Sequence, residues 1–316
     1  MKWMIACLFA TVCALGPVAA AQIPVILDTD IGDDIDDTWA LCLLLESPEL
    51  DLKLVVSDNG SAIYRAKLIA KLLTVAGRTD VAVGVGLRPE GEPGRQAKWV
   101  EGYDLAGYGG TVHQDGVGAL IRTIMESAEP VTLICIGPVP NIAAALAREP
   151  RIAQKARFVG MHGSVRRGYG GSAEVSAEWN VRADPGACRA ALSAPWDITI
   201  TPLDTCGLVH LRGERYAAVR RCTAPLTAAL IENYRIWSAS QGDSAQAETA
   251  SSTLFDTVAV YLAFAEDVVE MERLPIRVTD DGYTRIDEQG GRLMDVAVGW
   301  KDMGAFEDLL VRRLTQ

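Results

Sequence analysis

The chain has 316 residues, of which 30 are lysine or arginine and 41 are aspartate or glutamate, so its formal net charge at pH 7 is -11. Nucleic acids and anionic membranes are bound by clustered basic side chains. The only dense basic spot, Arg166-Arg167, is too small to form such a surface. The composition therefore argues against a nucleic-acid partner and against an anionic membrane surface.

The first 22 residues, MKWMIACLFATVCALGPVAAAQ, are typical of a cleaved secretory signal peptide. Lys2 precedes an apolar stretch, and small residues that end at Ala21 supply a cleavage site. The stretch is shorter than the roughly 20 apolar residues of a membrane-spanning helix. We therefore expect residues 1–21 to be removed and the mature protein to be soluble, exported to the periplasm or the medium, and without membrane contact after cleavage.

Residues 22–316 contain no linker, internal repeat or low-complexity block, so we expect a single domain. Short apolar segments rich in Val, Ile and Leu alternate with longer amphipathic or Ala-rich segments, and they lack the period-two alternation of half-exposed strands. We predict strands at 23–27, 52–56, 81–85, 131–136, 156–161 and 197–202, and helices at 36–46, 61–76, 115–127, 139–148 and 183–193. This order predicts an α/β fold with a mostly parallel, Rossmann-like open sheet flanked by helices.

From residue 213 the pattern becomes helical, and we predict helices at 213–222, 225–240 and 252–265. The polar, Gly-containing segment 277–299 predicts a hairpin, and a last helix is predicted near 303–314. We interpret these elements as a C-terminal helical and hairpin addition to the same domain.

Five cysteines remain once the signal peptide is removed. This is an odd number, the cysteines are widely spaced, and no two of them form a C-x-x-C motif. This pattern fits neither a disulfide framework nor a zinc site. Cys42 and Cys135 lie in apolar runs and are predicted to be core residues. Cys188, Cys206 and Cys222 could include one disulfide, which export would permit.

Residues 25–37, VILDTDIGDDIDD, carry a dense cluster of carboxylates directly behind an apolar run: Asp28, Asp30, Asp33, Asp34, Asp36 and Asp37. Ionised carboxylates this close raise one another's pKa. A solvated acidic turn that caps the next helix accounts for only one or two of them. A bound divalent cation removes the repulsion, and a purely oxygen ligand set favours Ca²⁺ or Mg²⁺ over zinc. Ligands of parallel sheets bind beyond the carboxyl ends of the strands, where this cluster is expected.

The stretch VILDTDIGDDIDDTWAL resembles the opening motif of the inosine-uridine preferring nucleoside hydrolase family, a strand followed by DTDPGxDDAxAL. Ile31 replaces the proline of that motif, and three residues stand where the motif has one, so we align Asp36-Asp37 with its DD pair. Other segments resemble the family in the same order: Asn59 at the end of the second strand, TVHQDGVG (111–118), LICIGPVPNIA (133–143), AEWNVRADPGA (177–187) and STLFDTVAV (252–260).

This resemblance implies a Ca²⁺-dependent enzyme that hydrolyses the N-glycosidic bond of ribonucleosides to base and ribose, with inversion. It implies that Ca²⁺ is held by Asp30, Asp37, Asp256 and the backbone carbonyl of Ile136. It implies that Asp36 is the general base that takes a proton from the attacking water. Family members are commonly dimers or tetramers, so a homo-oligomer is expected.

For the sugar and the leaving base, the resemblance implies the following residues: Asn59, Glu178 and Asn180 as ribose contacts, and His113 from the segment 111–118 as a catalytic residue. Each also has a simpler interpretation, because Asn59 and Asn180 could serve turns, His113 could be a structural loop histidine and Asp256 could be an N-cap. Their joint order along the chain favours the functional interpretation.

Two positions depart from the family pattern. Phe255 stands where purine-handling members have the histidine that usually protonates the leaving base, and Ser172 stands near the place of another ribose-contacting Asn. The leaving base could instead be activated by His113, by His162 or by the helix ENYRIW, which carries Tyr234, Arg235 and Trp237. We take Tyr234 and Trp237 as substrate contacts, with core packing of these aromatics as the alternative.

Two further hypotheses belong to other functional classes. A non-catalytic, metal-dependent nucleoside- or sugar-binding protein is suggested by Phe255 and Ser172. A phosphate-ester hydrolase with Asp28 as nucleophile is suggested by the strand followed by DTD, but the Thr or Ser and Lys residues of that chemistry are absent from the usual places.

Overall fold

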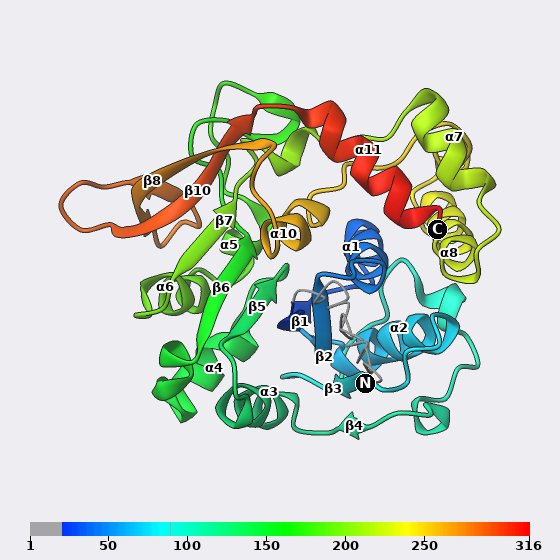
Figure 1. Cartoon of the computed structure of the whole chain (residues 1–316), viewed down its shortest axis with the longest axis horizontal. Helices are drawn as coiled ribbons and strands as arrows, with labels where there is room; N and C mark the ends of the chain where they lie inside the picture. Colours follow the sequence, from blue (N-terminus) through cyan, green and yellow to red (C-terminus); the bar gives the residue numbers. More distant parts are fainter. Residues whose placement is uncertain (1–20, 89) are drawn as a thin grey trace, which may run out of the picture.

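The computed structural model describes residues 21–88 and 90–316, and its core is a ten-stranded sheet with the order β4-β3-β2-β1-β5-β6-β7-β10-β8-β9 (Figure 1). Every neighbouring pair from β4 through to β10 is parallel, and only β8 and β9 run antiparallel to their neighbours. The strands are β1 (Ile23–Thr29), β2 (Leu50–Ser57), β3 (Ala82–Gly84), β4 (Val112–His113), β5 (Val131–Cys135), β6 (Ala156–Met161), β7 (Ile198–Thr201), β8 (Val269–Val278), β9 (Thr284–Ile286) and β10 (Arg292–Trp300). The predicted mostly parallel α/β fold is confirmed.

Helices cover both faces of the sheet. They are α1 (Asp36–Leu45), α2 (Ala62–Val75), α3 (Gly116–Glu126), α4 (Pro140–Arg148), α5 (Trp179–Ala183), α6 (Pro185–Ser193), α7 (Gly213–Arg221), α8 (Pro225–Ser240), α9 (Gln246–Thr249), α10 (Thr257–Leu262) and α11 (Met303–Leu314). Figure 1 shows α3, α4 and α6 on one side of the sheet and α1, α2, α8 and α10 on the other. Each face therefore has its own buried layer.

The alternation of side chains along β1 explains the two layers. Val25 and Leu27 pack into the layer formed with α1 and α2, whereas Ile26 packs into the layer formed with α3 and α4, and all three are fully buried. Successive side chains of a strand point to opposite faces. A strand covered on both faces must therefore be apolar at every position, which is the pattern that the sequence has here.

The parallel register aligns the carboxyl ends of the central strands. Asp28 of β1 pairs with Val56 of β2 and with Cys135 of β5. The residues that follow these three strands therefore leave the sheet at the same edge. This places the aspartate-rich turn after β1 next to the turn that follows β5.

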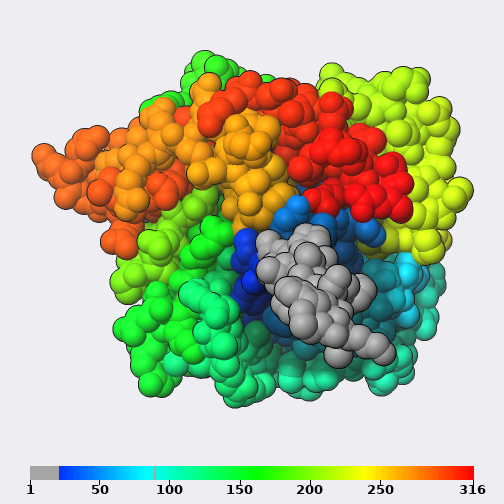
Figure 2. All heavy atoms as spheres, viewed as in Figure 1, coloured from blue at the N-terminus to red at the C-terminus, as the bar shows by residue number. Residues whose placement is uncertain are grey.

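The C-terminal part differs from the prediction. The hairpin begins earlier than expected, at Val269, and β10 lies parallel beside β7, so it extends the main sheet rather than being added to it. The far end of this hairpin projects from one side of the molecule (Figure 2). The helix predicted at 252–265 is shorter, because only Thr257–Leu262 are helical. Strand β4 and helices α5 and α9 were not expected, since two to five residues carry too little periodicity to be recognised.

Residues 1–20 of the predicted signal peptide lie outside the described residues. Within 21–88 and 90–316, no helix combines the length and apolarity that crossing a bilayer requires. Cys42 and Cys135 are fully buried, as predicted for core residues. The five cysteines of the described residues are all free thiols, so the suggested disulfide is not formed.

Candidate active site

The carboxyl ends of β1, β5 and β6 open onto one cavity of about 360 Å³, which we call the acidic cavity. Seven of the residues that line it carry carboxylates. The lining is Asp30, Asp33, Asp34, Asp36, Asp37, Arg95, Ile136, Met161, Tyr169, Glu178, Trp179, Asn180, Phe255 and Asp256. The location is the one that ligands occupy in parallel sheets.

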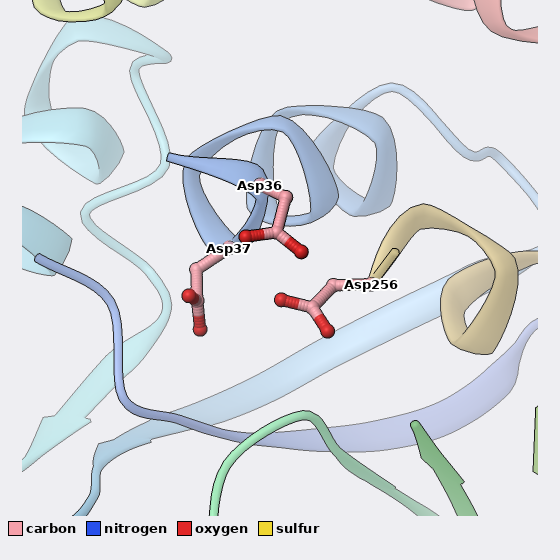
Figure 3. Close-up of side chains that lie close together, drawn as sticks. All are labelled: Asp36, Asp37 and Asp256. Atoms are coloured by element: carbon pink, nitrogen blue, oxygen red, sulfur yellow. The ribbon is translucent and has the colours of Figure 1, made fainter. Parts of the chain in front are cut away.

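Three carboxylates converge in this cavity from two distant parts of the chain. Asp36 and Asp37 form the first turn of α1, and Asp256 is the residue directly before α10. One oxygen from each lies within 4.8 Å of the others, and the three side chains point toward one another (Figure 3). Helices α1 and α10 pack together on the same face of the sheet, which brings Asp256 to the aspartate-rich turn.

The three carboxylates are almost completely buried, with exposures of 3 to 4%. Burial raises the pKa of each well above its usual value, and repulsion raises it further, from Asp34 on Asp36, from Asp30 on Asp37 and from Asp36 on Asp256. A buried group of oxygen ligands with uncompensated negative charge fits a hard divalent cation. The donor set is therefore suited to Ca²⁺ or Mg²⁺.

Asp30 and the carbonyl of Ile136 line the same cavity, as expected for the ligand set. Asp30 does not belong to the group of three, whereas Asp36, the predicted general base, does. Gly137 lets the turn after β5 approach β1, because a Cβ there would lie 3.1 Å from both the backbone N and Oδ1 of Asp30. Burial raises the pKa of Asp30 to about 6, against the opposing effect of Arg65.

Glu178 and Asn180 also line the cavity, at the start of α5. The Glu178 carboxylate accepts hydrogen bonds from three backbone N–H groups, those of Gly163 (2.9 Å), Asn180 (2.7 Å) and Val181 (3.3 Å). Burial nevertheless raises its pKa to about 7. The Asn180 amide nitrogen donates to the carbonyl of Ile136 over 3.2 Å, so Asn180 also orients a proposed metal ligand.

Three residues expected to touch the substrate do not reach the cavity. His113 ends β4, the outermost strand of its edge of the sheet. Tyr234 is fully buried, and its hydroxyl donates to the carbonyl of Ala250 over 3.0 Å. Trp237 packs its ring against that of Tyr234, with 5.8 Å between the ring centroids. Both aromatics therefore lie in the core layer that α8 forms with α1, which is the arrangement of the alternative interpretation.

Other candidates are placed beside or beneath the cavity. Asn59 ends the segment after β2 with a φ of 53° and lies next to Asp30 rather than in the lining. His162 is fully buried, and its Nε2 lies 3.1 Å from the carbonyl oxygen of Gly137. Arg235 pairs with Glu248 over 2.6 Å. None of these three supplies a proton donor inside the cavity.

Asp28 is placed too deeply for the role that the phosphate-ester hypothesis requires. It is fully buried, does not line the cavity, and accepts a hydrogen bond from the Asn141 amide over 2.9 Å. Burial and the neighbouring Asp58 raise its pKa well above the usual value. A nucleophile must reach its substrate, so this hypothesis is wrong.

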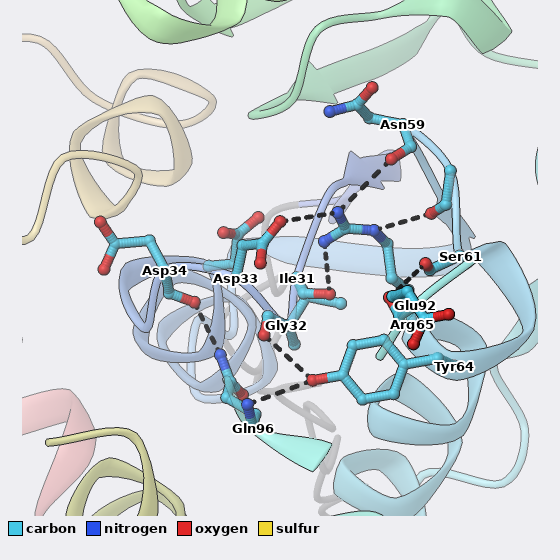
Figure 4. A network of polar contacts seen from close by, with 12 residues as sticks. Ile31, Gly32, Asp33, Asp34, Asn59, Ser61, Tyr64, Arg65, Glu92 and Gln96 are labelled. Atoms are coloured by element: carbon cyan, nitrogen blue, oxygen red, sulfur yellow. Dashed lines mark hydrogen bonds and ion pairs between the residues drawn. The ribbon is translucent and has the colours of Figure 1, made fainter. Parts of the chain in front are cut away.

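The turn formed by residues 31–34 is held by donors from outside the motif (Figure 4). Each of its four carbonyl oxygens accepts a hydrogen bond from a distant side chain: Ile31 from Arg65 (2.9 Å), Gly32 from Tyr64 (3.0 Å), Asp33 from Trp237 (2.9 Å) and Asp34 from Gln96 (2.6 Å). The two additional residues of this motif are thereby fixed in one conformation, which sets where Asp36 and Asp37 begin α1.

Sequence reasoning missed several residues of the lining. Tyr169 and Trp179 are large aromatics with exposures of 44% and 49%, and Tyr169 lies edge-on to Phe255 with 6.1 Å between centroids. Arg95 is the one basic residue of the lining. Trp179 lies inside a recognised motif, AEWN, and could have been found. Arg95 and Tyr169 lie in Gly-rich loops that have no periodic signal.

Solved structures share this fold. A plant nucleoside hydrolase, the PpNRh1 enzyme, superposes with a TM-score of 0.75 at 22% identity and covers 93% of this chain and 99% of its own. The inosine-uridine preferring nucleoside hydrolase from Bacillus anthracis superposes with a TM-score of 0.71 at 20% identity, with the same coverage.

Sequence relatives agree with the fold. The non-specific ribonucleoside hydrolase RihC of Klebsiella pneumoniae is 32% identical over 233 residues, which are 70% of this chain and 75% of that protein. The pyrimidine-specific ribonucleoside hydrolase RihA of Escherichia coli O7:K1 is 30% identical over 228 residues, which are 66% of this chain and 70% of that protein. The family model described as inosine-uridine preferring nucleoside hydrolase matches residues 25–304. The chain therefore belongs to the inosine-uridine preferring nucleoside hydrolase family.

Proposed function

We propose that this protein is an exported, Ca²⁺-dependent hydrolase that cleaves the N-glycosidic bond of ribonucleosides to base and ribose, with inversion at the anomeric carbon. The observation that carries the proposal is the convergence of Asp36, Asp37 and Asp256 in a buried cavity that Glu178 and Asn180 also line. Membership of the family supports the reaction type.

Asp30, Asp37, Asp256 and the Ile136 carbonyl would hold the cation, with Asp36 beside them. When bound, Ca²⁺ would supply a positive charge that orients sugar hydroxyls and makes a water molecule more acidic. Asp36 then takes the proton of the attacking water as general base. Asp36 is only 4% exposed, and in the absence of a cation burial raises the pKa of its carboxyl group well above the usual value.

The sugar develops positive charge as the bond to the base breaks, because the transition state of glycoside hydrolysis resembles an oxocarbenium ion. The carboxylates of the cavity stabilise this charge in a medium of low dielectric constant. Glu178 is fixed by three backbone donors, so its carboxylate is held ready to accept hydrogen bonds from ribose hydroxyls. Attack by water without a covalent intermediate gives inversion.

The deciding experiment measures release of free base and ribose from a panel of nucleosides, with CaCl₂ and with a chelator. We expect turnover that the chelator abolishes and Ca²⁺ restores. Asp36→Asn should lower kcat by about 10² to 10⁴-fold, the range for loss of a general base. Asp280→Asn makes the same chemical change at an exposed ion pair on the surface and serves as the matched control.

The alternative is a non-catalytic nucleoside- or sugar-binding protein, which Phe255 in the cavity lining favours because it offers no proton to the leaving base. Ribose or nucleoside binding by the natural chain without turnover of any nucleoside would establish this alternative. Turnover that persists in chelator would instead contradict the role of Ca²⁺.

Export and assembly need their own measurements. We expect the mature protein to begin near Gln22, which N-terminal sequencing of periplasmic or secreted material tests. We also expect a homo-oligomer, either a dimer or a tetramer, which analytical ultracentrifugation distinguishes from a monomer.

A further inference from the structure

A single basic side chain, that of Arg95, lines the acidic cavity. Seven of its fourteen lining residues carry carboxylates, and Arg95 is the only basic one. Within the described ranges none of the ion pairs of 4.0 Å or less involves Arg95, although its positive charge lowers the pKa of the neighbouring Asp34. A guanidinium without an ion-pair partner can bind an anionic or electron-rich part of a ligand.

Two contacts hold Arg95, whose side chain is exposed, beside the cavity. The next residue, Gln96, is fully buried, and its backbone N–H donates to the carbonyl of Gly32 over 3.3 Å. With the Gln241 amide oxygen turned toward Arg95, this oxygen accepts from Nε over 3.0 Å and from Nη1 over 2.5 Å. These two contacts involve Nε and Nη1, so the third guanidinium nitrogen, Nη2, is not used by them. Arg95 is therefore held at the cavity by the same turn that carries the aspartates.

The cavity lacks a histidine that could protonate a leaving base. Phe255 stands in the lining directly before Asp256. Of the three histidines, His113 ends β4, His162 lies beneath Gly137, and His210 lies 3.2 Å from the Thr253 hydroxyl, and none of them lines the cavity. The cavity therefore offers a departing base no histidine as a proton donor.

We propose that Arg95 assists departure of the nucleobase by stabilising the negative charge that develops on it, an assignment that rests on the proposed hydrolase function. The C1′–N bond breaks, and its electron pair moves to the base nitrogen. Water forms the new C1′–O bond and gives its proton to Asp36. The base leaves as an anion beside the guanidinium, which keeps its proton, and takes a proton from solvent afterwards.

The role predicts a dependence on the leaving group. A nucleobase is a poor leaving group and needs the positive charge, whereas 4-nitrophenolate is already a stable anion and needs little help. Loss of Arg95 should therefore slow the hydrolysis of nucleosides far more than that of 4-nitrophenyl β-D-ribofuranoside. A merely structural role would slow both reactions equally.

The test compares the natural chain, Arg95→Met, Arg95→Lys and Lys98→Met on uridine, inosine and 4-nitrophenyl riboside, with saturating CaCl₂. Lys98→Met removes an exposed positive charge three positions away that does not line the cavity. For Arg95→Met we expect kcat/KM to fall about 100-fold or more on both nucleosides, a typical loss for one electrostatic group. On the nitrophenyl riboside it should stay within about threefold, Arg95→Lys should recover part of the loss, and Lys98→Met should match the natural chain.

Two outcomes would overturn the role of Arg95: an equal loss on all three substrates, or no loss on any. An inactive natural chain on every riboside would instead overturn the hydrolase function itself, and the Arg95 role with it. Because the nitrophenyl riboside reports hydrolysis independently of Arg95, these failures are distinguishable.

Discussion

The indole Nε1 of Trp237 donates a hydrogen bond to the backbone carbonyl of Asp33 over 2.9 Å, although the two residues are 204 positions apart in the chain. Trp237 lies on α8 and is only 7% exposed. It therefore supports the aspartate-rich turn through this hydrogen bond and does not line the acidic cavity. Helix α8 therefore positions the aspartate-rich turn. The sequence alone had suggested that the aromatics of this helix contact the base.

Replacement of Trp237 by Phe keeps most of the ring packing and removes the hydrogen bond to Asp33. We expect the free energy of unfolding to fall by about 1 kcal/mol, the usual net value of such a bond. We also expect kcat/KM on a nucleoside to fall, because the turn that positions Asp36 gains freedom. Denaturant unfolding and steady-state kinetics measure the two effects.

Trp300→Phe is the matched control for this change, because the Trp300 indole donates to the Thr205 carbonyl over 3.0 Å and neither residue lines the cavity. It should lower stability to a similar extent and leave kcat/KM unchanged. Equal effects of the two variants on kcat/KM would contradict the positioning role of Trp237.

The affinity for Ca²⁺ should increase with pH. Burial and repulsion raise the pKa of Asp36, Asp37 and Asp256, and burial raises that of Asp30 to about 6. Protons therefore compete with the cation, and binding must release them. Isothermal titration calorimetry between about pH 5 and 8, in buffers of different ionisation enthalpy, measures both the dissociation constant and the proton release. A dissociation constant independent of pH would contradict this coupling.

Replacement of Asp256 by Asn should affect stability in opposite directions with and without the cation. Without it, the variant should be more stable than the natural chain at neutral pH, because one member of the repelling group has lost its charge. With saturating Ca²⁺ it should be less stable than the natural chain, because a ligand is missing. Thermal unfolding in chelator and in CaCl₂ tests both statements, and a destabilised variant in chelator would refute the first.

Acidification should destabilise the fold through His162. Burial lowers its pKa from 6.5 to about 4, so between these values the unfolded chain binds more protons than the folded chain. Stability that is present above pH 6.5 is therefore lost as the pH falls toward 4, by on the order of 3 kcal/mol. His162→Gln keeps a side-chain donor for the Gly137 carbonyl and should lack this contribution. Identical pH dependence of unfolding in the two proteins would disprove it.

Local sequence patterns were sufficient to predict the bounds of several strands and helices. The predicted strand at 156–161 and the predicted helices at 225–240 and 303–314 coincide with β6, α8 and α11. Apolar runs and helical spacing depend on side chains a few positions apart, so they are readable along the chain. The aspartates of the first motif were equally visible, because strand, turn and helix start follow one another directly.

The partners of distant segments were decided by tertiary packing. The sequence did not indicate that β10 would pair with β7, because strand pairing depends on which edge of the sheet remains open. The same holds for α8, whose aromatics could face either the base or the core. Only the packing of α8 against α1 and α2 selects the core.

The sequence by itself determined the composition of the site: a carboxylate-rich turn after the first strand, joined by Glu178, Asn180 and Asp256 from later motifs. The tertiary structure decided its geometry, grouping Asp36 with Asp37 and Asp256 and bringing Arg95 into the cavity. The physical reason is that residue types follow from chemistry at each position, whereas distances between remote side chains depend on how the helices pack against the sheet.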